Sequence, residues 1–573
     1  AQWFLTNYLH LKGQIAITKE FTKKERFIDP LSSNTTAKIQ KEEELEGDLY
    51  LTKGESTNWD AQVGVYVSKS FGAHALNASA VVNATSRESE STSSHYRGFP
   101  SGEYHSPNYA AEIKDKPSKS QSTSRLAGFL FLANYTWNDI YLADVSVRFD
   151  GSSEFGLDQK WAPFWSFGAG VNLHNYAFLH GSKVINRMKF RASYGQTGKV
   201  NFPSYSARTV YRTFDRWYVA GFGVGLKALG NRDLKWETTN KLNVGTDMEF
   251  WNSRISLIFD YYYNKTVDLI TDVTLPGSAG FSSYKSNLGE TLNKGFDIQF
   301  RFDVMKNKDW NVALWGNLNH NRNEILKISD ALKAYNSQVD DYYELAEEDQ
   351  TSNSSWVKAN KTYSDFIKPI MKYEEGASLT AIYGVRSLGI DPSNGKELYL
   401  YRNGQASHKW KATEEIVLGD SEPEASGSFG LNVTYKNFSL FASFGYEWGK
   451  QTYNETLIMN VENADIQGSN VDKRVLTQRW EKPGDIAPLK DIKDMNSVTL
   501  PTSRFVQDEN VLSLDALTLS YDFDPLWLRK IYLKTLRLEV STSELFRLSS
   551  IKQERGTSYP FARTVNFSLR ATF

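Results

Sequence analysis

Apolar and polar residues alternate without a break along the segment of residues 565–573. Successive side chains of a β-strand point to opposite faces, so this segment predicts a strand with one apolar face and one polar face. A strand of this kind fits a transmembrane β-barrel, whose wall meets lipid on one side and a watery lumen on the other, and it equally fits a soluble β-sandwich. The residues of the apolar face are Val565, Phe567, Leu569, Ala571 and Phe573.

The same alternation recurs along most of the chain. Residues 242–250 and 255–263 alternate on either side of the short turn 251–254, which predicts a hairpin. In total the pattern predicts roughly 16–18 antiparallel strands of the length that a tilted membrane strand requires. Other alternating segments cover residues 3–19, 62–68, 126–137, 140–149, 310–318, 438–448, 517–523 and 536–540.

The connections between these strands are of two kinds. Residues 137–139 and 436–437 form short turns, whereas residues 86–124, 271–283 and 328–380 are long, polar and irregular in pattern. Short turns at one end and long loops at the other are typical of outer-membrane barrels. In a compact soluble domain, loops of such length would be unusual.

Composition agrees with a barrel of aromatic-rich strands. Aromatic residues make up 14% of the chain, with 31 Tyr, 33 Phe and 15 Trp. Several gather at expected strand ends, at residues 161–167 and 261–263, where they fit the aromatic girdle of a membrane barrel; the alternative is a soluble core. The mean hydropathy of -0.49 is low, and no apolar run reaches the roughly 18 residues of a transmembrane helix. A barrel is still compatible with this value, because only every second strand residue faces lipid.

Charge and residue types exclude several classes of function. The formal net charge is -1, so no broad basic surface indicates a nucleic-acid partner. The chain has no Cys, which excludes disulfides, thiolate metal sites and a Cys nucleophile within these residues. The eight His are scattered, and neither G-x-S-x-G nor H-E-x-x-H occurs. We therefore expect no enzymatic activity, no metal and no cofactor.

Three short segments have both a structural and a functional interpretation. Residues 221–225 are glycine-rich like a nucleotide loop, but without a βαβ context we interpret them as a strand end. Residues 391–395 are rich in oxygen ligands but lack the acidic positions of an EF-hand, so we interpret them as a turn. Residues 470–480 have helical spacing that stops at Pro483, which predicts a helix bracing a loop.

Seven segments, in order, resemble the SusC/RagA-like family of TonB-dependent transporters of the Bacteroidota outer membrane. The clearest are R-x-D-G-S-S-x-F-G at residues 148–156, R-A-S-Y-G-x-T-G at 191–198 and L-K-W-E-x-T at 234–239. The others cover residues 261–270, 287–297, 382–391 and 504–508. The signature positions that this resemblance marks as structural are Asp150, Gly151, Ser152, Tyr194, Gly195, Trp236 and Glu237.

The resemblance implies an all-β transmembrane antiparallel barrel of about 22 strands with long extracellular loops. Residues 1–573 would supply its C-terminal portion. Family members also have a plug domain and a TonB-contacting box, and neither is recognisable here. We therefore expect the plug and the first strands to lie outside this chain, on a second chain or another segment. Phe573 would be the terminal aromatic that the barrel-assembly machinery recognises.

The resemblance also implies a function and its partners. Oligosaccharides or peptides would be captured under a SusD-like lipoprotein lid and imported with energy that the TonB–ExbB–ExbD system delivers through the plug. Loop aromatics Tyr104, Trp217 and Tyr218 are candidate substrate contacts, although girdles and protein interfaces use the same residue types. Two other interpretations are open: a barrel that serves as a structural or assembly subunit without transport, and a soluble β-rich carbohydrate-binding protein.

Overall fold

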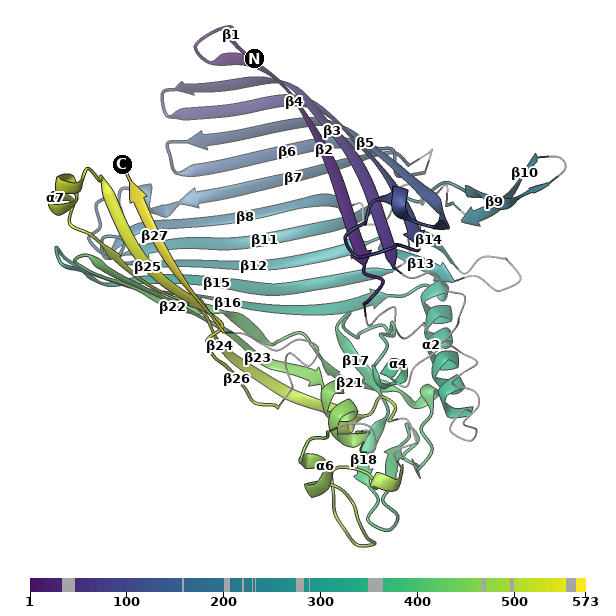
Figure 1. Ribbon diagram of the computed structural model, residues 1–573. Coiled ribbons are helices and arrows are strands. Elements are labelled where there is room, and N and C mark those ends of the chain that lie inside the picture. Colours follow the sequence, from purple (N-terminus) through teal and green to yellow (C-terminus); the bar gives the residue numbers. More distant parts are fainter. Residues whose placement is uncertain are drawn as a thin grey trace.

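Strands dominate the computed structural model. It describes residues 1–32, 47–156, 159–199, 207–218, 221–228, 230–231, 233–274, 283–287, 289–348, 364–464, 466, 470–494, 499–552 and 563–573. The largest unit is one 18-stranded sheet of antiparallel pairs that curls into a trough (Figure 1). The predicted antiparallel β-barrel fold is confirmed, with the strand number expected from the sequence.

Strands that follow one another in the chain are neighbours in this sheet. Within the described residues, β1 pairs only with β2 and β27 only with β25, so the sheet has two edges without a further partner. The strands are β1 (Gln2–Phe4), β2 (Leu9–Ile28), β3 (Asp48–Phe71), β4 (His74–Arg97), β5 (Glu112–Trp137), β6 (Tyr141–Ser152), β7 (Trp161–Asn172), β8 (Ile185–Lys199), β11 (Glu237–Phe250), β12 (Ile255–Val267), β15 (Glu290–Lys306), β16 (Trp310–Lys327), β22 (Ala425–Tyr435), β23 (Phe438–Tyr453), β24 (Val506–Asp522), β25 (Thr535–Ser543), β26 (Arg547–Ser549) and β27 (Thr564–Thr572).

The register gives the sheet two chemically different faces. Leu242 lies opposite Tyr263 and belongs to the apolar face, which we call the outer face, whereas Asn243 lies opposite Tyr262 on the polar inner face. Large apolar residues of the outer face, such as Phe129 and Phe167, are exposed. The girdle interpretation therefore fits Trp161, Trp165, Phe167, Tyr261 and Tyr263. It is wrong for Phe164, which is buried, and for Tyr262, because alternation turns both side chains to the inner face.

The two ends of the sheet differ as expected. At the short-turn end, residues 138–140 and 436–437 link neighbouring strands, and Asn138 and Asp139 take left-handed φ angles of 54° and 56°. Asn and Asp tolerate this conformation better than most residues. Phe573 follows β27 at the same end. Long connections gather at the opposite, long-loop end, which in outer-membrane barrels is extracellular.

The prediction of long irregular loops is partly wrong. β4 and β5 run through most of residues 86–124 and leave only 98–111 as a connection, because polar residues on both faces hide the strand period. Residues 328–380 contain helices α2 (Asp330–Glu348) and α4 (Ser364–Ile367), although residues 349–363 lie outside the described residues. None of the described helices has the length and apolar character needed to cross a membrane.

The shorter predicted elements have mixed outcomes. Residues 221–225 begin strand β10 (Gly221–Ala228), in agreement with the strand-end interpretation. Residues 391–395 form a turn in which Asp391 Oδ1 accepts hydrogen bonds from the Ser393 amide and hydroxyl at 2.9 and 2.7 Å. The helix expected at 470–480 is limited to one turn, α6 (Arg474–Thr477). The irregular loop predicted at residues 271–283 is partly wrong, because β13 (Ile270–Thr274) pairs with β14 (Ser283–Asn287); residues 275–282 lie outside the described residues.

The main hydrophobic core lies in the long connections and not in the sheet. We call the described parts of residues 364–424 and 454–505 the loop cap; α2 packs against it. The cap contains the pair β17 (Ala381–Gly384) and β21 (Ile416–Asp420) and the sheet of β18 (Arg386–Ile390), β19 (Glu397–Leu400) and β20 (Ala406–Ser407). Tyr343 of α2 and Tyr383 are completely buried there. The cap is therefore a compact body at the long-loop end (Figure 1).

Candidate functional site

Polar side chains of five neighbouring strands form a hollow on the inner face. Pairing places Ser193 beside Asn243 and Asn243 beside Tyr262 in one row, with Asp260 beside Asp297 in the next. The hollow has a volume of about 580 Å³. Its remaining lining residues are Arg191, Lys241, Asn264, Gln299 and Asn319. This wall therefore presents hydrogen-bond donors and acceptors, and it carries both positively and negatively charged side chains.

Arg191 of β8 forms an ion-pair network in this wall, and we call Arg191, Asp247 and Asp260 the Arg191 hub. Its Nη2 donates to Asp260 Oδ2 at 2.7 Å, and its Nε donates to Asp247 Oδ1 at 3.3 Å. Gly245 lies between these partners, and a Cβ there would be 2.3 Å from Asp260 Oδ1 and 2.9 Å from Arg191 Cζ. The absence of a side chain at Gly245 therefore makes room for the ion pair.

A second polar area lies where β3, β4 and β5 continue beyond the apolar band toward the long-loop end. Thr52, Gly54 and Ser56 of β3 lie opposite serines of β4, which in turn lie opposite serines of β5. We call this area the serine face: Thr52, Gly54, Ser56, Ser89, Ser91, Ser93, Ser118, Ser120 and Ser122. Alternation puts it on the inner face, and each hydroxyl can donate and accept hydrogen bonds.

Charged residues take the opposite side of the same extended strands. Lys19 lies 2.5 Å from Glu55, and Lys119 lies 2.7 Å from Glu90. These exposed cross-strand pairs are each of small energetic value. The side chains of the serine face are shorter than these charged ones.

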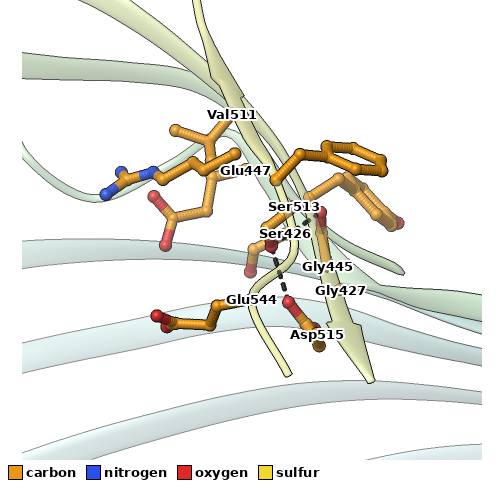
Figure 2. A pocket seen from close by; sticks show the side chains of 11 residues that line it. Ser426, Gly427, Gly445, Glu447, Val511, Ser513, Asp515 and Glu544 are labelled. Atoms are coloured by element: carbon orange, nitrogen blue, oxygen red, sulfur yellow. Dashed lines mark hydrogen bonds between the residues drawn. The ribbon is translucent and has the colours of Figure 1, made fainter. Parts of the chain in front are cut away.

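A second hollow lies on the inner face of β22, β23, β24 and β26, with a volume of about 410 Å³ (Figure 2). Two register shifts between β23 and β24 widen the sheet at this point. Ser513 points toward Asp515 and donates a hydrogen bond of 2.6 Å to Oδ1 (Figure 2). Glu447, Glu544 and Arg547 also line the hollow, so its charged lining has three carboxylates and one guanidinium group.

The loop cap is held by a buried ionic cluster. Arg504 Nη2 donates to Glu397 Oε2 and to Glu462 Oε1, each at 2.7 Å. Thr502 donates to the other oxygen of Glu397 at 2.7 Å. Burial opposes ionisation of Glu397, but Arg504 outweighs it, and the pKa of Glu397 lies below its usual value. We call these residues the Arg504 clamp.

A second buried cluster joins α2 to the loop cap. Lys372 Nζ donates to Asp340 Oδ1 of α2 at 2.5 Å, and it lies 2.6 Å from Glu415 Oε2. Glu415 is completely buried. Burial raises the pKa of Glu415 to about 7 although Lys372 opposes the shift. The protonation of this carboxyl therefore changes near neutral pH.

Of the three predicted substrate-contact residues, only Tyr104 has a described side chain. Tyr104 is exposed in the connection 98–111, and its ring lies 5.1 Å from that of Tyr109. Trp217 and Tyr218 belong to strand β9 (Val210–Tyr218), which pairs with β10 in a hairpin. The side chains of Trp217 and Tyr218 lie outside the described residues. Substrate contact by these residues stays a prediction.

The first signature positions have local structural roles. Arg148 Nε donates to both carboxylate oxygens of Asp150 at 2.6 Å. A Cβ at Gly151 would be 2.7 Å from the ring of Trp161. Ser152 Oγ accepts a hydrogen bond from the amide of residue 154 at 3.2 Å. These contacts shape the connection between β6 and β7.

The other signature positions lie on β8 and at the start of β11. Trp236 stacks on Phe155 with a ring distance of 4.3 Å, and Glu237 Oε2 accepts from the Ile270 amide at 3.5 Å. Tyr194 is exposed on the outer face, and a Cβ at Gly195 would be 2.5 Å from that of Ser166. These contacts are local to each residue, and a structural role for the signature positions stays a prediction.

The chain is similar to known proteins in both sequence and fold. The family model described as "TonB dependent receptor-like, beta-barrel" matches residues 22–395. TonB-dependent receptor P3 of Formosa agariphila is 28% identical over 501 residues, which cover 86% of this chain and 48% of that protein. TonB-dependent receptor SusC of Bacteroides thetaiotaomicron is 25% identical over 469 residues, 76% of this chain and 42% of that protein.

A solved structure described as that of the RagAB peptide transporter has the same fold. Its TM-score is 0.80 at 21% sequence identity, and the match covers 96% of this chain and 57% of that chain. The chain spans about half the length of the curated relatives that it matches. Since the family model covers more than half of the 573 residues, the chain belongs to the TonB-dependent receptor β-barrel family, whose members are outer-membrane transporters and receptors and not enzymes.

Proposed function

We propose that this chain forms part of the wall and the extracellular mouth of an outer-membrane nutrient importer. The observation that carries the proposal is the polar inner face, with the Arg191 hub on the wall and the serine face at the mouth. Relatives named as TonB-dependent receptors and a similar structure named as a peptide transporter support the same activity. The substrate would be an oligosaccharide or a peptide, which Tyr104, Trp217 and Tyr218 would contact at the loops.

The importer would require further strands and a plug. The outer edges of β1 and β27 have no partner among the described residues, and unpaired backbone in lipid costs several kcal/mol for each group. We propose that strands of a second chain or another segment complete the barrel, and that a plug there couples it to the TonB–ExbB–ExbD system. Phe573 would direct insertion by the barrel-assembly machinery.

The β9–β10 hairpin supports a SusD-like lipoprotein lid as partner. It projects from the long-loop end, and no third strand among the described residues pairs with it (Figure 1). Tyr211 and Val224 of this hairpin are exposed. An isolated two-stranded hairpin is only marginally stable in water, so contact with a lid would stabilise it.

Uptake in the native bacterium tests this proposal. Cells that lack the chain are compared with the parent for import of fluorescent oligosaccharide and peptide pools, with and without TonB. We expect import of one pool to require both the chain and TonB. Arg191→Glu should reduce this import, because it removes the cation of the hub, whereas exposed Lys333→Gln should not. Normal import without TonB would overturn the proposal and favour a structural or assembly role.

A further inference from the structure

The connection between β24 and β25 differs from its neighbours at the short-turn end. Residues 436–437 make a minimal turn, but residues 523–534 form helix α7 (Pro525–Leu528) followed by a turn of 3₁₀ helix, η9 (Arg529–Ile531). Asp524 caps α7 by accepting from the Leu526 amide at 2.7 Å. Tyr532, with a left-handed φ of 60°, ends the segment. Figure 1 shows α7 standing clear of the sheet.

This segment exposes large apolar side chains. Leu526 is 70%, Trp527 50%, Ile531 45% and Tyr532 91% exposed, all within seven residues. Leu528, in contrast, is completely buried, and α7 contacts β25 of the sheet. A fixed segment that presents a group of exposed apolar residues is typical of an interaction surface.

The apolar patch continues the aromatic row of the outer face. The ring of Trp527 stacks on Phe523 at 5.9 Å, and Phe523 meets the edge of Tyr521 at 5.0 Å. Tyr521 lies 4.6 Å from Phe438, and both belong to the outer face. The patch therefore lies on the lipid side of the wall, at the level where aromatic side chains meet the headgroups.

Cations surround this patch. Arg529, Lys530 and Lys534 are exposed, and no ion pair joins any of them to a described residue. On the neighbouring turn, Lys436 lies over the ring of Tyr435 at 5.4 Å. Apolar side chains beside flexible cations are typical of segments that lie in the membrane interface, because the apolar parts enter the acyl boundary while the charges stay with the headgroups.

We propose that residues 525–534 form an interfacial foot that binds the phosphate headgroups of anionic phospholipids in the periplasmic leaflet. Leu526, Trp527 and Tyr532 insert at the acyl boundary, and the three cations contact the phosphates. The occupant is a lipid surface because the patch is continuous with the lipid-facing aromatic row. The foot adds a lipid-dependent anchor to the barrel, independently of what the barrel imports.

Lipid retention by the full-length protein tests this proposal. The protein is placed in nanodiscs of phosphatidylcholine and phosphatidylglycerol, and retained lipids are counted by native mass spectrometry. A photoreactive phosphatidylglycerol maps the contact by peptide analysis. We expect labelling within residues 523–534. Replacing all three cations with Gln should weaken phosphatidylglycerol retention by roughly fivefold for each charge at low ionic strength, or about hundredfold in total.

Matched variants separate this role from a general loss of charge or fold. The control carries Lys473→Gln, Lys482→Gln and Lys493→Gln at the long-loop end and should retain the lipid. Arg529→Lys with Lys530→Arg keeps both charges and should also retain it. Equal retention by the triple variant and the control would overturn the proposal, as would labelling elsewhere. Capture of a periplasmic protein in place of lipid, lost in the triple variant, would equally overturn it.

Discussion

Arg504 Nη2 donates a hydrogen bond of 2.7 Å to Glu397 Oε2 across 107 residues of sequence. Both side chains are almost completely buried, and the same nitrogen also reaches Glu462. The interaction joins the two long connections that make up the loop cap. The cap should therefore depend on this pair more than on any exposed ion pair.

Arg504→Leu should strongly destabilise the loop cap. The substitution leaves the carboxylates of Glu397 and Glu462 buried without their cation, and breaking a buried pair in this way costs about 3–5 kcal/mol. Hydrogen exchange of the reconstituted protein measures the free energy of opening of residues 397–400 and 458–464. Lys333→Gln is the control, because its pair with Asp330 is exposed and contributes about 1 kcal/mol or less. Similar opening energies in the two variants would contradict the prediction.

The stability of the loop cap should fall as the pH rises toward neutral. Glu415 has a pKa of about 7 in the folded protein against an ordinary 4.5, so between these values the folded state holds a proton that the unfolded state has lost. The free energy of unfolding therefore decreases with rising pH over this window, by up to about 3 kcal/mol. Below the window both states hold the proton, so this group no longer makes the free energy of unfolding depend on pH.

Glu415→Gln should remove this pH dependence. Hydrogen exchange of residues 412–417, corrected for the intrinsic rate at each pH, measures it between pH 5 and pH 8. Glu414→Gln, one residue earlier and only partly buried, is the control and should keep the wild-type profile. An unchanged profile in Glu415→Gln would show that this carboxyl does not titrate in the window.

Where one face of a strand is apolar, the sequence predicted the structure well. Residues 242–263 form the expected hairpin, with Leu242 opposite Tyr263. The register is well determined, because a slip of one residue would move the whole apolar set to the other face of the sheet. Residues 86–124 were missed as strands, since serines and charges on both faces leave no hydrophobic period. The family signatures located Arg504, but nothing local in the sequence identifies a partner 107 residues away.

Gly245→Ala should distort the Arg191 hub without preventing the fold. The new Cβ would be 2.3 Å from Asp260 Oδ1, so the ion pair with Arg191 must shift, at a cost of about 1–3 kcal/mol. Gly13→Ala is the control, because its nearest neighbour lies 4.0 Å away. The temperature at which the folded barrel loses its characteristic gel mobility measures the difference. Equal temperatures for the two variants would mean that the wall has more room than the structure shows.

Trp236→Ala tests whether the signature positions hold the wall together. Trp236 is buried between Phe155 and Phe164, at ring distances of 4.3 and 5.3 Å, so its truncation leaves a large cavity. Loss of such a side chain costs about 3–5 kcal/mol. The free energy of unfolding in urea, measured in vesicles, should fall by this amount.

Trp251→Ala is the matched control, because Trp251 is exposed in a turn at the short-turn end. Its loss removes interfacial contact and creates no cavity, so the free energy of unfolding should change by about 1 kcal/mol or less. If Trp251→Ala were as destabilising as Trp236→Ala, membrane anchoring and not the packing of the signature would govern stability. If only Trp236→Ala lowers the free energy of unfolding, the tryptophan of the L-K-W-E-x-T signature has a packing role. Its indole is then needed between Phe164 of β7 and Phe155 of the connection before β7.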